Sequence, residues 1–149
     1  MTERDCEKAQ LFLYAYRWGW RLGGKCPEMI ALVIRNRVKS GWSGRNGYGY
    51  LGVIENAPLV SYTDKEPPLE YPDFRDRTVS RLSQRIDDIV DQRVADEGLA
   101  SVLDVNTHRL VPALYWIDIS DTKNIRPWWT QHFQGRRPLV TASNLWLYS

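Results

Sequence analysis

The first half of the chain is organised as helices with large apolar faces. Residues 9–22 are dense in large apolar side chains, and Gly23 and Gly24 follow them at once. Thr2 precedes Glu3 and can open this helix with acids near its positive end, while a glycine pair is typical of a helix end. The pattern therefore predicts a first helix that is apolar on more than one face.

A second helix follows directly. Pro27 suits a first helical turn, and residues 29–38 are mostly large and apolar up to Ser40 and Gly41. Such a segment has little polar surface to offer to water, so we expect it to form the spine of the core.

A third amphipathic helix is predicted from Arg77 to about Val94, with Asp76 as its cap. Arginine and aspartate fill one face, which is typical of a solvated surface. Its apolar residues recur at three- and four-residue steps: Val79, Leu82, Ile86, Ile89, Val90 and Val94.

The remaining segments predict shorter elements. Residues 43–50 are glycine-rich and loop-like, and residues 51–57 form a short helix before Pro58. A polar, proline-containing stretch up to Pro72 is interpreted as a surface excursion and not as a domain linker. Leu114–Ile117 and Leu139–Leu147 predict two strands around a short helix that begins at Pro127. Together these elements predict an α+β fold: a mainly helical single domain over residues 1–149 with a small C-terminal antiparallel β element.

The length of the chain and its two cysteines narrow the class of protein to which it can belong. A chain of 149 residues can bury a sizeable core without disulfides or metal. Cys6 and Cys26 would lie near opposite ends of the first helix, on the order of 25–30 Å apart, so both are expected to be free thiols in a cytoplasmic protein. No signal peptide or membrane span is expected from the sequence, and a protein acting on a cell wall would need release by lysis or another route.

Charge is unevenly distributed along the chain. Residues 14–54 hold seven basic side chains against the single acid Glu28, whereas residues 55–104 hold six basic and twelve acidic ones. Two faces of opposite sign would follow, unless the two segments pack together and offset one another. A nucleic-acid partner is not favoured, because no binding module is present and the basic residues are spread through an apolar helix.

Two stretches resemble a known family. ALVIRNRVKSGW (residues 31–42) contains Asn36, Arg37 and Val38, and it resembles the second helix of the spore-cortex-lytic (SleB-like) cell-wall hydrolases. The tail gives a second resemblance, since ALYW (residues 113–116), PWW (127–129) and TASN (141–144) follow that family's order of strand, tryptophan-bearing helix and closing strand. The resemblance runs from about Leu11 to the end and implies the fold and a peptidoglycan substrate.

The resemblance also exposes a missing acid. The family carries a glutamate on the helix before Asn-Arg-Val, and counting back without gaps from Asn36 places Trp18 there, or Tyr16 with a two-residue gap. Glycoside cleavage needs a carboxylic acid held protonated beside the glycosidic oxygen, which neither an indole nor a phenol provides at neutral pH. The family's closing histidine is also absent, with Asn144 or Leu145 near its place.

A relocated acid is one alternative. Glu28 lies at the start of the predicted second helix and could face a cleft as a catalytic acid, although a first-turn glutamate commonly faces water as a partner of the helix dipole. His108 and His132 are the only histidines and no zinc-site spacing occurs, so no metal or other cofactor is expected.

Seven tryptophans are more than an ordinary core of this size needs. Flat indole faces suit the C–H faces of sugars, but aromatic residues also concentrate at protein interfaces. The candidate substrate-binding residues are Trp18, Trp20, Asn36, Tyr115, Trp116, Trp128, Trp129 and Asn144. The leading hypothesis is a divergent cell-wall hydrolase-like protein that binds glycan or cleaves it weakly. The alternative is a non-enzymatic protein-interaction module, such as an inhibitor, immunity or phage-derived component.

Overall fold

The protein is described here from a computed structural model, in which residues 1–44, 47–56, 70–91, 113–118, 135–141 and 144–148 are placed well enough to describe. The predicted fold class is confirmed: helices predominate, and a small antiparallel sheet lies near the C-terminus. The helices are α1 (Glu3–Gly19), the 3-10 turn η1 (Trp20–Leu22), α2 (Cys26–Lys39), α3 (Tyr50–Asn56) and α4 (Arg77–Asp91). The strands are β1 (Ser43–Gly44), β2 (Gly47–Tyr48), β3 (Tyr115–Asp118), β4 (Val140–Thr141) and β5 (Leu145–Tyr148).

The start of α1 follows from local chemistry. The Thr2 hydroxyl accepts a hydrogen bond from the Asp5 backbone N–H at 3.2 Å, and the Asp5 carboxylate accepts one from the Thr2 N–H at 3.1 Å. This capping box satisfies two backbone donors that a helix start leaves open. At α4 the predicted cap is confirmed, because the Asp76 carboxylate accepts from the Thr78 N–H at 2.8 Å.

Two predictions for the short elements are wrong. The glycine-rich segment 43–50 contains the short hairpin β1–β2, in which Ser43 pairs with Tyr48, as well as the first residue of α3. The single strand expected over residues 139–147 is instead two antiparallel strands, β4 and β5, with Thr141 opposite Trp146. The polar Ser143-Asn144 pair interrupts the apolar run of the sequence, and such residues favour turns. The helix predicted from Pro127 lies outside the described residues.

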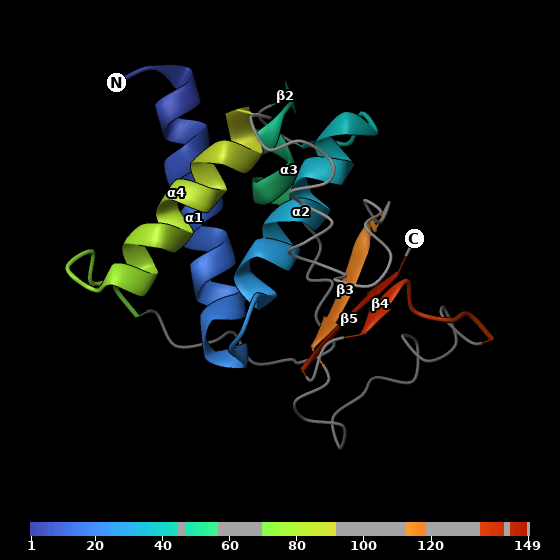
Figure 1. The fold of residues 1–149 in the computed structure, drawn as a ribbon. Coiled ribbons are helices and arrows are strands. Elements are labelled where there is room, and N and C mark those ends of the chain that lie inside the picture. Colours follow the sequence, from blue (N-terminus) through green and yellow to red (C-terminus); the bar gives the residue numbers. More distant parts are fainter. Residues whose placement is uncertain (45–46, 57–69, 92–112, 119–134, 142–143, 149) are drawn as a thin grey trace.

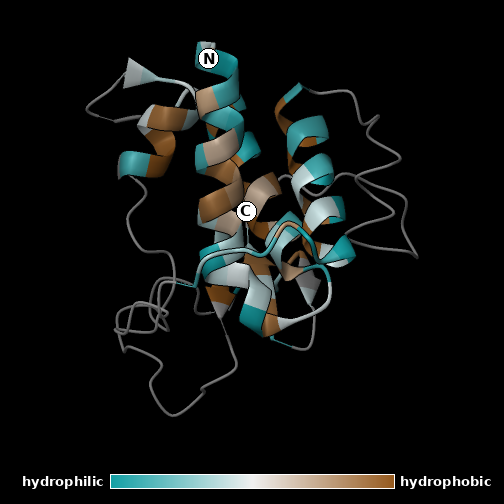
Figure 2. Cartoon of the chain, turned by 90° about the vertical axis from the view of Figure 1, so that its left-hand side faces the viewer, coloured by the Kyte–Doolittle hydropathy of each residue, from teal (hydrophilic) through white to brown (hydrophobic). Residues whose placement is uncertain are grey.

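The helix α2 lies at the centre of the molecule. Figure 1 shows α1 and α4 along it and the sheet of β3, β5 and β4 on its other side. In Figure 2 the hydrophobic sides of the helices turn inward and their hydrophilic sides turn outward. One apolar cluster joins the four α-helices, and a second joins α1, η1 and α2 to β3 and β5. Since α2 contributes to both clusters, the predicted spine of the core is confirmed.

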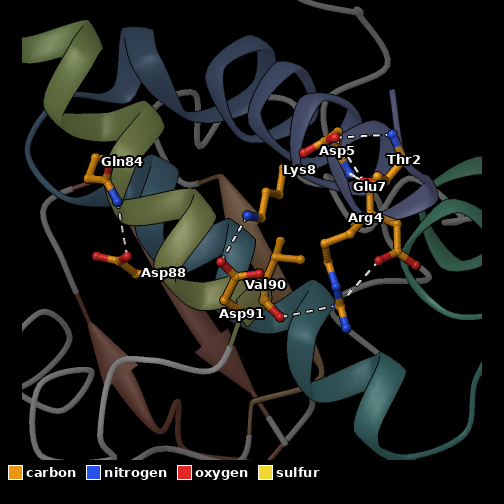
Figure 3. Close-up of polar contacts among 9 residues, drawn as sticks. All are labelled: Thr2, Arg4, Asp5, Glu7, Lys8, Gln84, Asp88, Val90 and Asp91. Atoms are coloured by element: carbon orange, nitrogen blue, oxygen red, sulfur yellow. Dashed lines mark hydrogen bonds and ion pairs between the residues drawn. The ribbon is translucent and has the colours of Figure 1, made fainter.

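Polar contacts hold the N-terminal part of α1 to the C-terminal end of α4 (Figure 3). The Lys8 ammonium lies 2.8 Å from an Asp91 carboxylate oxygen, and Arg4 donates to the Val90 carbonyl at 3.4 Å. Both contacts are part-exposed, so each contributes modestly, but together they fix the direction in which α4 crosses α1.

The close crossing of α1 and α2 depends on Gly19. A Cβ at this position would lie 2.7 Å from the backbone of Pro27, which cannot move without displacing the start of α2. Alanine in place of a helical glycine would ordinarily stabilise the protein by about 0.5–1 kcal/mol. At Gly19 the clash with Pro27 outweighs this gain, so alanine should destabilise the protein.

We therefore expect Gly19→Ala to lower the free energy of unfolding by about 1–3 kcal/mol, as overpacking does in other cores. Urea unfolding monitored by tryptophan fluorescence measures it. Ala9→Ser, at an exposed position of the same helix, serves as control and should change stability by less than about 0.5 kcal/mol. A Gly19→Ala protein as stable as the wild type would show that α1 and α2 do not approach this closely.

Candidate functional site

Two of the predicted substrate-binding tryptophans lie in the core. Trp18 is 6% exposed and Trp116 is not exposed, and their ring centroids are 5.9 Å apart with the planes tilted. Both belong to the cluster that joins the helices to the sheet. The predicted residues are thus brought together here, but Trp116 has no surface to offer to a ligand.

The predicted asparagines bond to backbone carbonyls. The Asn36 amide donates to the Ala113 carbonyl at 2.9 Å, and the Asn144 amide donates to the Leu22 carbonyl at 2.9 Å. These bonds join residues far apart in the sequence and tie the sheet region to α2 and η1. Tyr115 lies edge-on to Trp42, with ring centroids 5.9 Å apart.

Trp20 has a different position. It is half-buried, and its ring stacks on Tyr16 with the centroids 5.1 Å apart. Trp128 and Trp129 lie outside the described residues. The predicted binding residues that the structure describes therefore lie mainly between the helices and the sheet and do not line a single open cleft.

Glu28 is half-buried in the first turn of α2. Burial raises the pKa of its carboxyl group above the ordinary 4.5, an effect partly opposed by its own backbone N–H and by the charges of Lys25 and Arg85. The influence of Arg85 indicates that Glu28 is on the side of α2 that approaches α4. A raised pKa suits a general acid, but Glu28 does not line the pocket over α1 described below.

That pocket lies over the outer side of α1 and encloses about 420 Å³. Aromatic side chains dominate its wall, and Trp18 and Tyr16 both line it, the two positions where the family resemblance places the missing acid. Its lining residues are Gln10, Leu13, Tyr14, Tyr16, Arg17, Trp18, Ile54, Glu70 and Tyr71. Such a volume with a few polar groups among aromatic rings is typical of small-molecule and sugar sites.

Sequence reasoning singled out only Trp18 and Tyr16 among the lining residues of this pocket, and Glu70 and Tyr71 are two of those it missed. Glu70 and Tyr71 precede Pro72 in the stretch interpreted as a surface excursion, and both are exposed. Glu70 is the one carboxylate in the pocket wall, among its described residues. Burial raises the pKa of Tyr16, and the negative charges of Glu70, Asp76 and Asp73 raise it further. The available signal was a tyrosine in a polar, proline-containing segment, and such a residue does not indicate which helix it packs against.

Three further findings concern metal binding, membrane-crossing helices and the cysteines. The described residues contain no group of three or more His, Cys, Asp or Glu side chains that could hold a metal ion. None of the helices in the described ranges is both long enough and apolar enough to cross a bilayer. Cys6 and Cys26 form no disulfide.

Comparisons with protein-family models, curated proteins and solved structures found no match to this chain. The resemblance to the spore-cortex-lytic hydrolases therefore stays a prediction from the sequence motifs.

The raised pKa of Glu28 has a consequence for stability. Between pH 4.5 and the raised pKa, the folded protein binds more protons at Glu28 than the unfolded chain does. The stabilisation from protonated Glu28 is therefore complete below pH 4.5 and is lost as the pH rises through the raised pKa.

We expect Glu28→Gln to remove this loss, because glutamine does not ionise. As the pH rises from 4 to 7, the free energy of unfolding of the variant should therefore increase relative to that of the wild type. Urea unfolding at both pH values measures the difference. Glu3→Gln is the matched control, because Glu3 is an exposed acid in the first turn of α1. If Glu28→Gln and the wild type respond equally to pH, Glu28 is not desolvated in the folded protein.

Proposed function

We propose that this protein binds carbohydrate of the cell-wall, peptidoglycan-like type in the pocket over α1 and does not cleave it. The observation that carries the proposal is the wall of the pocket of about 420 Å³: the exposed ring of Tyr71 lines it together with Tyr14, Tyr16 and Trp18, of which Tyr16 and Trp18 are largely buried. Sugar rings present flat C–H faces that pack against aromatic rings. Aromatic walls of this kind therefore favour a sugar over a small charged metabolite.

Sugar binding also requires hydrogen-bonding groups, and polar side chains in the pocket wall supply them. Gln10 carries both a donor and an acceptor, Arg17 carries donors only, and Glu70 carries acceptors. Sugar hydroxyl groups donate and accept at once, so a mixture of this kind matches them better than a wall with a single type of group. The proposal needs no cofactor.

The same wall argues against hydrolysis. A general acid must be kept protonated by an apolar setting next to the glycosidic oxygen. Glu70 is exposed to water at the pocket, and Glu28 lies away from it on the α4 side of α2. Trp18 and Tyr16 occupy the positions at which the resemblance implies an acid. We infer a hydrolase-like scaffold used for binding.

Tyr71→Ala is the sharpest test of binding, since Tyr71 is 84% exposed and its removal should leave the fold intact. We expect the affinity for soluble peptidoglycan fragments to fall about two- to tenfold, which corresponds to about 0.5–1.5 kcal/mol of lost ring contact. Isothermal titration calorimetry measures it. The matched control is Tyr48→Ala, because Tyr48 is 78% exposed on β2 and does not line the pocket.

A clearing assay on purified peptidoglycan separates binding from cleavage. We expect no clearing by the wild type, Glu28→Gln or Glu70→Gln under conditions where an active hydrolase clears the substrate. Clearing by the wild type that Glu28→Gln abolishes would establish a relocated acid and a working hydrolase. Absence of both clearing and binding would remove the glycan proposal altogether.

A second candidate function, protein docking, is favoured by one specific observation. Leu13, Tyr71 and Phe74 are large apolar side chains that are 45%, 84% and 57% exposed. Leu13 also lines a neighbouring pocket of about 400 Å³ with Phe12 and Phe74, so the two pockets meet at Leu13 along α1. A continuous apolar surface of this extent suits a protein partner better than one sugar unit.

Phe74→Ala distinguishes the two candidates, because Phe74 lines the neighbouring pocket only. If the protein binds glycan at the α1 pocket, Phe74→Ala should bind peptidoglycan fragments with wild-type affinity while Tyr71→Ala does not. If it docks a protein, a one-to-one complex recovered by size-exclusion chromatography should weaken with both substitutions. Loss of glycan binding in Phe74→Ala would place the sugar elsewhere on α1.

A further inference from the structure

The Arg37 side chain is enclosed by the protein. It is not exposed to solvent, and its Nε donates to the Leu114 carbonyl at 2.8 Å. The guanidinium carbon lies 4.8 Å from the centre of the Trp42 ring and 5.8 Å from that of Tyr115. Two aromatic rings and one carbonyl therefore fix the orientation of the guanidinium group between α2 and β3.

Both terminal nitrogens of Arg37 are left without an acceptor. Nη1 and Nη2 are buried and make no hydrogen bond, and Arg37 forms no ion pair with a carboxylate of the described residues. Guanidinium remains protonated in proteins, so a full positive charge is buried with its four terminal N–H bonds unpaired and with no carboxylate partner among the described residues. This is unusual, because buried charges in proteins are normally paired and hydrogen-bonded.

Two more donors lie nearby. The Tyr14 hydroxyl and the indole nitrogen of Trp116 are buried and also lack a hydrogen-bond partner. Tyr14 and Trp116 both pack against Trp18, with ring centroids 6.4 and 5.9 Å from it. Burial raises the pKa of the Tyr14 hydroxyl, and the positive charge of Arg37 and the indole N–H of Trp116 oppose that rise. Donors from α1, α2 and β3 are thus gathered in one buried region, which we call the donor cluster: Tyr14, Arg37 and Trp116.

We propose that the donor cluster binds a small monovalent anion, a halide or the carboxylate group of a small acid. An anion accepts hydrogen bonds from several donors at once and also neutralises the buried charge. A water molecule would satisfy some of the donors, but it would leave the charge of Arg37 uncompensated in a low-dielectric interior. Arg37 and Trp116 do not line the α1 pocket, whereas Tyr14 lines it, so the two sites share Tyr14 and Arg37→Gln tests the donor cluster separately from the glycan site.

Thermal unfolding tests the proposal on the whole chain. The wild type is titrated with sodium formate or sodium chloride, with the ionic strength held constant by the sodium salt of a bulky sulfonate buffer. We expect the unfolding temperature to rise and then saturate with each small anion, as linkage requires for a ligand of the folded state. Arg37→Gln should show no such rise. Equal rises in both proteins, or no rise in the wild type, would overturn the proposal.

Tyr14→Phe keeps the test decisive if Arg37→Gln fails to fold. It removes one hydroxyl group and no charge, and it should raise the anion concentration at half-saturation severalfold. Tyr16→Phe, which changes a hydroxyl outside the donor cluster, should leave that concentration unchanged. An unchanged half-saturation in Tyr14→Phe, with the wild type responding, would place the anion elsewhere.

Crystals grown in sodium bromide provide direct evidence, since bromide can be located by its anomalous scattering. We expect a peak within hydrogen-bond distance of the Arg37 Nη atoms. If bromide occupies surface positions only and formate gives no stabilisation, the donor cluster binds no small anion and the proposal is wrong. A halide peak together with a formate response assigns an inorganic ion, whereas a response to formate alone assigns the carboxylate of an organic ligand.

Discussion

The burial of α2 is the constraint on which the rest of the structure depends. Its apolar residues pack into both clusters of the core, so a polar group buried on this helix needs a partner inside the protein. The Asn36 amide and the Arg37 Nε find one by donating to the carbonyls of Ala113 and Leu114, the two residues just before β3. The Asn-Arg pair therefore fixes the sheet to the helices. The motif on which the family resemblance rests has a structural use that any protein of this architecture could share, whatever its activity.

The same burial changes the interpretation of the charge pattern. The basic segment was expected to form a positive face or to pack against the acidic segment. The helix α4, from the acidic segment, does pack against α1 and α2. In addition Arg35 is 4% exposed and Arg37 is not exposed, and as residues two apart on a helix they point to different sides. Arg35 lies near Tyr50, whose pKa is raised to about 12 mainly by burial. Part of the positive charge of this segment is thus inside the protein, where it cannot attract nucleic acid, so its effect is on the stability and ligands of the core.

The fold could be predicted further than the site because helices are encoded locally. Apolar spacing and the caps Thr2 and Asp76 were sufficient to place α1, α2 and α4. The pocket over α1 depends instead on where residues 70–71 return to that helix, and no local pattern specifies this. The same limit applies to Trp18 and Trp116. The high number of tryptophans in the chain suggested a sugar-binding surface, but the sequence does not distinguish an indole that binds sugar from one that fills a core. Asn36 and Asn144 were likewise predicted from their type, whereas their backbone partners lie 77 and 122 residues away.

The structure also indicates why the acid implied by the resemblance could not be restored by one substitution. Trp18 packs against Trp116, and this contact is part of the cluster that holds the sheet to the helices. Replacing an indole in such a position by a smaller side chain typically costs about 3–5 kcal/mol, and a carboxylate there would also be desolvated. The guanidinium carbon of Arg17 lies 6.0 Å from the centre of the Trp18 ring. An acid at position 18 would therefore remove a contact that holds the sheet to the helices. A return to hydrolysis by this route would require the helix-to-sheet packing to change along with residue 18.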